Sequence, residues 1–199
     1  MKTSIALVAV AGFAAAASAQ NFSLSIAGAP TTVDTTMGAV TVTVDIIGDS
    51  DFGTHMLGGG FTMTSGSSLV EGMSWAAASW SSFNTDGGYA GGGDYGQVIF
   101  GQLVIPGVPP FDVPAPGSEL GSAIGSFQIV IGQGTGIIDL SIAAGSPFSL
   151  EVLDLAGGTT AQSSNGNLTL NGASINVVPA PSAMALLGLG GLVAGRRRR

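Results

Sequence analysis

Apolar and polar residues alternate with a period of two along most of the chain between residues 20 and 177, a pattern that predicts half-buried β-strands. In the clearest run, residues 40–46, four β-branched apolar residues alternate with Thr41, Thr43 and Asp45. A more buried strand is expected over residues 98–105, with a bend at Gly101. Further alternating runs occupy residues 22–26, 61–64, 127–131, 138–142, 148–152, 168–170 and 175–177.

Turn residues separate these runs. Asn165-Gly166 and Asn171-Gly172 are typical of hairpins, and the second pair also fits a bulge because the alternation changes phase there. Residues 73–80 fit a helix or a strand equally well. About nine or ten short strands in a stretch of about 160 residues predict one all-β domain, a two-sheet β-sandwich over residues 20–177.

Three of these segments resemble strands of known sandwich families. Residues 38–46, GAVTVTVDI, are similar to an early strand of cohesin-like and carbohydrate-binding sandwiches, and residues 126–131 and 137–143 are similar to their closing strands. The resemblance implies a jelly-roll or cohesin-like topology. It implies no function, because one sandwich fold serves many unrelated activities.

Two segments are rich in turn residues and are expected to project as long loops. Residues 84–96 combine six glycines with two aspartates and two tyrosines, and residues 106–118 contain five prolines. Stacking of aromatic rings on sugars, with carboxylates bonding the hydroxyl groups, makes the first loop a candidate carbohydrate-binding site formed by Asp86, Tyr89, Asp94 and Tyr95. The alternative is a surface loop whose rings pack on the sandwich.

Charge is distributed very unevenly along the chain. All twelve acidic residues lie between Asp34 and Asp154, whereas the five basic residues lie at the two extreme ends of the sequence. The central domain therefore has no Lys or Arg to contact phosphate, which argues against nucleic acid as a partner and disfavours anionic lipid.

The carboxylates of the central domain have no Lys or Arg side chains to balance them, which makes a bound cation a candidate. Asp45, Asp49 and Asp51 lie beside the turn glycines Gly48 and Gly53, and hard oxygen ligands at this spacing form a candidate Ca²⁺ site. The alternative is an acidic, solvated loop. No other cofactor is expected.

Residues suited to catalysis are few. The chain has no cysteine, one histidine (His55) and no G-x-S-x-G segment, which excludes several nucleophilic and multi-histidine metal sites. A glycosidase needs only two carboxylates, so Glu71, Glu119 and Glu151 remain candidates for that chemistry. We expect a protein that is not an enzyme, with a two-carboxylate glycoside hydrolase as an alternative.

Residues 1–19 have the order of features found in a secretory signal peptide. The charged Lys2 precedes an apolar stretch over residues 5–17, and Ala17-Ser18-Ala19 gives a small-x-small cleavage pattern. Export through the secretion translocon would leave Gln20 as the first residue. The alternative is a short hydrophobic core helix.

The segment 178–199 contains three features in order. These are the proline-containing stretch 178–182, an uncharged stretch over residues 183–195, and a terminal cluster of Arg196, Arg197, Arg198 and Arg199. A helix over residues 182–195 would span about 21 Å, which is short of the roughly 30 Å hydrocarbon core of a bilayer. The arginines mark a cytoplasmic end, so we expect a short transmembrane helix with the domain outside.

This order resembles the PEP-CTERM protein-sorting signal. In Val178-Pro179-Ala180-Pro181-Ser182, the two prolines and the serine match the motif, and Ala180 replaces its usual glutamate. The resemblance implies processing by an exosortase-like membrane enzyme and a final place at the cell surface or in an exopolysaccharide matrix. The alternative is a plain membrane anchor.

These observations together predict an exported, transiently membrane-anchored protein with a structural or adhesive role. Extracellular polysaccharide is a further expected partner. A carbohydrate-binding or Ca²⁺-binding module is the alternative to this role.

Overall fold

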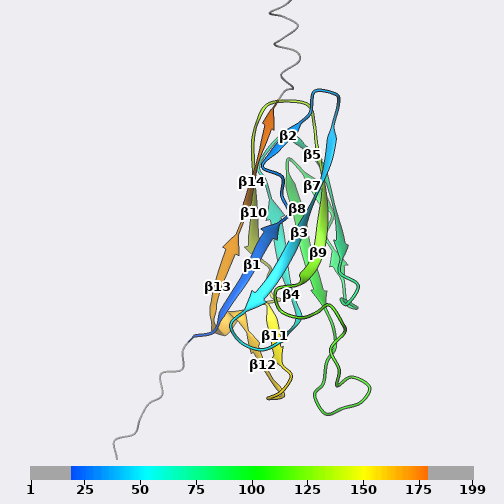
Figure 1. Ribbon diagram of the computed structural model, residues 1–199, viewed down its shortest axis with the longest axis vertical. Coiled ribbons are helices and arrows are strands. Elements are labelled where there is room, and N and C mark those ends of the chain that lie inside the picture. Colours follow the sequence, from blue (N-terminus) through cyan, green and yellow to red (C-terminus); the bar gives the residue numbers. More distant parts are fainter. Residues whose placement is uncertain (1–18, 179–199) are drawn as a thin grey trace, which may run out of the picture.

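The computed structural model describes residues 19–178, which form an all-β sandwich of two sheets with one short 3₁₀ helix, η1 (Ser163–Asn165) (Figure 1). The two-sheet sandwich predicted from the alternation is therefore confirmed. The first sheet has five strands in the order β13 (Asn167–Asn171), β1 (Asn21–Ala27), β3 (Val40–Ser50), β9 (Ala123–Ile131) and β5 (Val70–Ala77).

The second sheet has nine strands. Its main path runs through β12 (Thr159–Gln162), β11 (Glu151–Asp154), β4 (His55–Thr64), β10 (Gly136–Ala144), β14 (Ala173–Val178) and β2 (Thr32–Asp34). On the other side of β4 lies β8 (Asp94–Gly101), which also pairs with the short strands β6 (Thr85–Asp86) and β7 (Tyr89–Gly91).

The core lies between the inner faces of the two sheets, where the period-two residues meet. Every second residue of β1 and β3 points inward and is buried, as the alternation predicts. An aromatic cluster joins the sheets: the ring of Phe127 on β9 lies 4.9 Å from the rings of Trp75 and Tyr95 and 6.2 Å from that of Phe61. Aromatic rings at these distances add about 0.5–1.5 kcal/mol per pair beyond their burial.

Two segments differ from their predicted structure. Residues 84–96 are not one long loop, because they form β6, β7 and the start of β8, with Gly91, Gly92 and Gly93 making the tight turn at positive φ. The strand expected over residues 98–105 ends at Gly101. Beyond it the chain folds back on itself, and the amide of Ile105 donates to the carbonyl of Phe111.

Two ambiguities of the sequence are also decided by the fold. Residues 70–77 form the strand β5, so the segment 73–80 is not helical, and its last residues follow the strand. Asn171-Gly172 lies between β13 and β14, where the chain passes from one sheet to the other. This crossing accounts for the change of phase.

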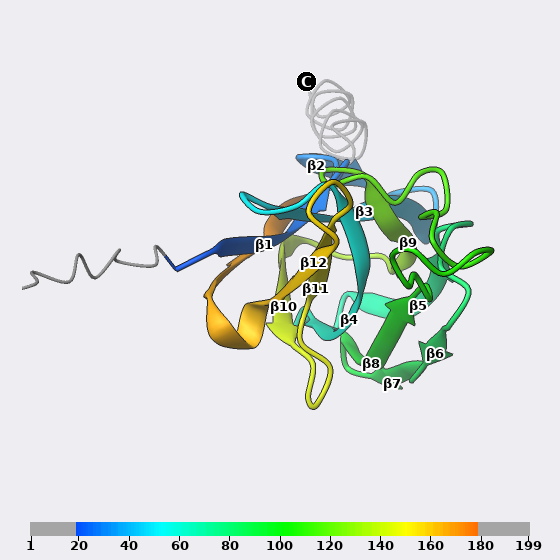
Figure 2. The same ribbon diagram turned by 90° about the horizontal axis from the view of Figure 1, so that it is seen from below.

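The two ends of the sandwich differ in the segments that they carry (Figure 1). Val178, the last described residue, lies at the end that also holds β2 and the turn between β9 and β10; we call this the exit end. The opposite end, called the far end, carries the loop 102–118 and the turn between β11 and β12. Figure 2 views the molecule from this far end.

Candidate functional site

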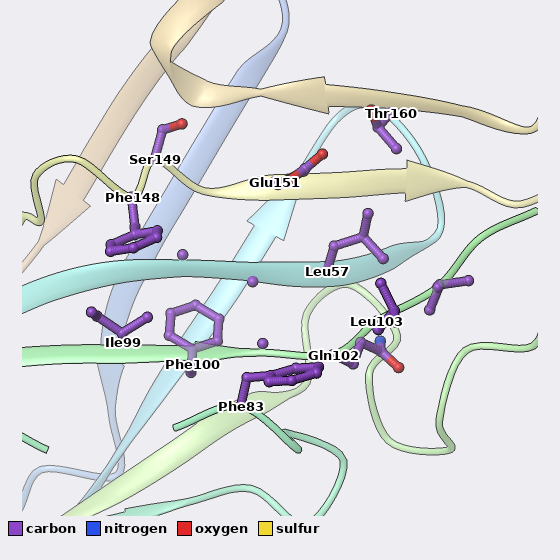
Figure 3. Close-up of a pocket in the computed structure, with 14 residues that line it drawn as sticks. Leu57, Phe83, Ile99, Phe100, Gln102, Leu103, Phe148, Ser149, Glu151 and Thr160 are labelled. Atoms are coloured by element: carbon purple, nitrogen blue, oxygen red, sulfur yellow. The ribbon is translucent and has the colours of Figure 1, made fainter. Parts of the chain in front are cut away.

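A shallow hollow of about 380 Å³ lies on the outer surface of the nine-stranded sheet, toward the far end, where β4, β8 and β11 meet (Figure 3). Phe148 and Phe83 flank the β4–β8 pair from opposite sides, and their side chains are 48% and 59% exposed. Leu57, Ile99 and Leu103 add apolar surface between them. The hollow is therefore walled mainly by apolar side chains.

Glycines form the floor of this hollow. Gly58 of β4 pairs with Gly101 of β8, and a Cβ placed on Gly58 would lie 2.7 Å from the carbonyl oxygen of Phe100. A Cβ on Gly59 would lie 2.7 Å from Cδ2 of Leu150. Glycine is needed for this close approach of the chains, and the floor is consequently strand backbone.

A second hollow of about 400 Å³ adjoins the first. The two share Phe83, Gln102 and Leu103, and the second adds Phe111 and Val113 from the loop 102–118. We call the two hollows together the apolar groove. Exposed apolar side chains therefore gather around both hollows, and clusters of this kind are found at interaction sites.

Hydrogen bonds fix the loop 102–118 beside the groove. The side chain of Gln102 donates to the carbonyl of Met56 and accepts from the amide of Ala115, both at 2.8 Å. Farther out, the amide of Phe111 donates to the carbonyl of Val108 at 2.8 Å. These bonds satisfy the backbone of the loop without placing its apolar side chains in the core. Val113 is 72% exposed.

The only charge in the lining of the groove is negative. Glu151 of β11 lines the first hollow. Asp112 lies between Phe111 and Val113 in the sequence but does not itself line the second hollow. Neither carboxylate has a hydrogen-bond partner among residues 19–178, a part of the chain that contains no Lys or Arg. The groove is thus an apolar surface with one carboxylate, that of Glu151, in its lining.

Three of the four residues proposed for sugar binding, Asp86, Tyr89 and Tyr95, make side-chain hydrogen bonds within the domain. Tyr95 is 4% exposed, so its ring is not available for stacking, and the prediction for this residue is wrong. Its hydroxyl donates to Asp86 at 2.6 Å and accepts from the amide of Trp75 at 3.2 Å. Burial, together with the bond to Asp86, raises the pKa of Tyr95 to about 12.

Tyr89 also fastens the two sheets together. Its hydroxyl donates to the carbonyl of Val70 on β5 at 2.6 Å, and the amide of Gly93 donates to it at 3.1 Å. Asp94 is exposed and pairs with Gly91 and Thr64 in the sheet. Both tyrosines therefore follow the alternative interpretation of this segment, in which its aromatic rings pack on the sandwich.

The three aspartates of the candidate Ca²⁺ site do not form a cage. Across residues 19–178, no group of three or more His, Asp or Glu side chains is placed to hold a metal ion, which contradicts the site predicted for Asp45, Asp49 and Asp51. Asp51 is held by Asn21, whose backbone amide donates to it at 2.8 Å and whose side chain donates at 2.5 Å. These hydrogen bonds, the backbone one first, lower the pKa of Asp51.

The candidate hydrolytic carboxylates lie in different places. Glu71 lies at the start of β5 near the exit end, and Glu119 forms an isolated bridge with His55. Of the three, Glu151 alone lines the groove. The groove therefore lacks the second carboxylate that glycoside hydrolysis requires.

The sequence did not single out Phe83, Leu103 or Phe148 as surface residues. Leu103 and Phe148 continue apolar alternations, which is the signature of a buried strand. For two of these residues the sequence did hold a signal, because proline interrupts strand pairing: Pro106 follows Leu103, and Pro147 directly precedes Phe148.

The predicted signal peptide (1–19), the sorting motif (178–182), the membrane segment (183–195) and the arginine cluster (196–199) lie outside the described residues, apart from Ala19 and Val178. Within residues 19–178 we find no helix with the length and apolar character needed to cross a membrane.

No family model matches this chain, and no curated protein matches it either. Among solved structures, it is similar to a type I cohesin–dockerin complex from Clostridium thermocellum, Coh-OlpA-Doc918, with 10% identity, a TM-score of 0.47, and coverage of 79% of this chain and 99% of that chain. It is also similar to the seventh ScaB type I cohesin from Pseudobacteroides cellulosolvens, with 12% identity, a TM-score of 0.42, and coverage of 81% and 94%. A third similar structure is AvmM, which catalyses macrocyclization in alchivemycin A biosynthesis, with 12% identity, a TM-score of 0.34, and coverage of 81% and 90%. None of these likenesses assigns a function to this chain.

Proposed function

We propose that this chain is an exported, surface-sorted, non-enzymatic adhesive protein that binds its target through the apolar groove. The observation that carries the proposal is the clustering of exposed apolar side chains around two adjoining hollows at the far end: Phe83, Leu103, Phe111, Val113 and Phe148. Keeping such a surface in water costs free energy, about 25 cal/mol for each Å² of apolar area, and a bound partner removes that cost.

The placement of the groove supports a role away from a membrane. Val178 lies at the exit end, and the predicted sorting motif and membrane segment follow it directly in the sequence. A tail held in a membrane would orient the sandwich with its far end outward. The groove would then face partners outside the cell.

The chemistry of the groove supports binding rather than turnover. Glu151 is the only ionisable side chain among the residues that line the two hollows, and no histidine lies beside Ser149 or Thr160 to activate a hydroxyl. General acid–base catalysis of glycoside cleavage needs two such groups.

Adhesion can be tested with beads that carry residues 20–178, a segment that contains both complete sheets and the core. Beads are applied to cells and extracellular material of the source organism, and their retention under flow is measured. We expect retention of the unmodified domain and loss of retention for Phe83→Ser combined with Leu103→Ser.

The matched control is Ile137→Ser, which removes an apolar side chain that is 64% exposed near the exit end. This variant should be retained like the unmodified domain. Equal retention of the groove variant and the control would show that adhesion, if present, uses another surface, and the proposal would be rejected.

Sorting is tested separately by the intact mass of the mature protein from its native host. The proposal expects a product that begins at Gln20 and has lost the residues after the motif 178–182. A mature product that retains Arg199 would leave a plain anchor as the correct description of the tail.

A further inference from the structure

The apolar groove has features that define the class of its occupant. An exposed apolar patch on a soluble domain fits either a protein or a lipid surface. Anionic lipid is opposed here, because Glu151 lines the groove, Asp112 lies on the neighbouring loop 102–118, and residues 19–178 contain no Lys or Arg to offset them. The position at the far end also directs the groove away from the predicted tail.

Charge complementarity favours a basic partner. The described domain carries all twelve acidic residues of the chain, so its field attracts cations and repels a second copy of itself. Glu151 and Asp112 have no hydrogen-bond partner among residues 19–178, and their carboxylates are therefore available to a lysine or arginine. A guanidinium pairs with a carboxylate through two parallel hydrogen bonds.

The shape of the groove favours an extended segment. Its two hollows, about 380 and 400 Å³, share the lining residues Phe83, Gln102 and Leu103. Each hollow is large enough for a leucine or phenylalanine side chain, and a backbone that passes over the shared residues would place one side chain in each hollow. Apolar anchors in pockets surrounded by polar rims are the usual source of binding energy at protein interfaces.

We infer that the apolar groove binds an extended segment of a partner protein in which two apolar side chains are flanked by lysine or arginine. This inference rests on the proposed adhesive function and specifies its partner. The apolar side chains fill the two hollows, and the flanking cations are attracted by Glu151, which lines the first hollow, and by Asp112 on the loop 102–118.

Three synthetic peptides test the inference against residues 20–178: RGLGGFGR, its neutral counterpart QGLGGFGQ and its acidic counterpart EGLGGFGE. Affinities are measured by calorimetry at low and at raised salt. We expect the arginine peptide to bind at least tenfold more tightly than the acidic one, with the difference shrinking as salt screens the charges. Phe83→Ser should abolish binding of all three peptides, whereas Ile137→Ser should leave it unchanged.

Charge and apolar contributions are then separated by the double variant Glu151→Gln with Asp112→Asn. This variant should lose the preference for the arginine peptide while still binding the neutral one. Equal binding of all three peptides by the unmodified domain would overturn the basic-partner inference and leave the adhesive function standing.

The remaining outcomes are equally decisive. If no peptide binds while bead retention still depends on Phe83 and Leu103, the occupant is not an extended segment, and this inference fails alone. If neutral lipid vesicles bind in a Phe83-dependent manner and the peptides do not, the occupant is a lipid surface and the inference is wrong. If the unmodified domain neither binds a peptide nor retains beads, the proposed adhesive function is rejected together with this inference.

Discussion

The hydroxyl of Tyr95 on β8 forms a hydrogen bond between the two sheets. The variant Tyr95→Phe removes this hydroxyl and keeps the packing of the ring. In the intact protein this hydroxyl accepts from the backbone amide of Trp75 on β5 and donates to Asp86 on β6. Phenylalanine leaves the amide of Trp75 without that acceptor, and an unpaired buried donor costs about 1–3 kcal/mol. Asp86 still accepts from the amide of Gly88, so we assign most of the loss to Trp75.

The same residue predicts a dependence of stability on alkaline pH. The pKa of Tyr95 is raised to about 12 in the folded protein, whereas a tyrosine in an unfolded chain has a pKa of about 10. Below pH 10 both states are neutral and the stabilisation is complete. Between about pH 10 and 12 the unfolded state ionises first, so stability falls as the pH rises. The full shift corresponds to about 2.7 kcal/mol, which solvent screening near Asp86 reduces to about 1–2 kcal/mol.

The assay is urea unfolding of residues 20–178 at pH 8 and at pH 11, followed by tryptophan fluorescence. At pH 8 we expect Tyr95→Phe to lower the free energy of unfolding by about 2 kcal/mol, or the melting temperature by about 4–8 °C. At pH 11 the gap between the two proteins should narrow, because the phenylalanine variant has no phenol to ionise at this position.

Tyr89→Phe is the matched control. It removes the other tyrosine hydroxyl of the chain and leaves the bond between Tyr95 and Asp86 intact, so the alkaline loss of stability should persist. In that variant the absorbance of tyrosinate reports on Tyr95 alone. Equal stability of Tyr95→Phe and the unmodified domain at pH 8, or a gap that does not change with pH, would refute this account of the contact.

Two further predictions concern Asp51, which follows β3, and Gly58 on β4. Hydrogen bonds from Asn21 lower the pKa of Asp51 in the folded protein, so the stabilisation that they give is present at neutral pH and is lost as the pH falls through that pKa. Asp51→Asn should therefore reduce the loss of stability in acid. The measurement is the free energy of unfolding as a function of pH in the acid range. Gly58→Ala should destabilise the domain by about 1–3 kcal/mol, since its Cβ would lie 2.7 Å from the carbonyl oxygen of Phe100. Gly72→Ala is the control in thermal melts, because a Cβ there meets only ordinary contacts at 3.8 Å, and an equal loss in both variants would show that close approach at β4 is not the cause.

The fold class follows from the sequence because burial in a sandwich has the same period as the side chains of a strand. Val42, Val44 and Ile46 alternate with polar neighbours, and all three are buried. Short strands such as β2, β6, β7 and β12 carry too few residues for a period to show. Their hydrogen bonds come from partners elsewhere in the chain, such as β14 for β2, and a single sequence gives no signal for such pairings.

The candidate site was predicted less well for a related reason. Phe148 precedes Leu150 and Val152 at the correct spacing for a buried face, yet regular pairing of this segment begins only at Glu151, and Phe148 turns outward. In contrast, Tyr95 lies in a glycine-rich segment typical of an exposed loop but is buried by packing against Phe127. Exposure depends in both cases on where the chain leaves the sheet, which local composition does not encode.

The opposite placement of groove and exit end has a mechanical consequence. A partner held at the far end and a tether attached beyond Val178 would put the sandwich under tension along its strands. The last strand, β14, is paired with β10 through five positions, from Val177 opposite Gly136 to Ala173 opposite Leu140, and it lies parallel to β2 on its other side. Force along β14 would load these rows of hydrogen bonds in shear, so that they resist together instead of unzipping one by one.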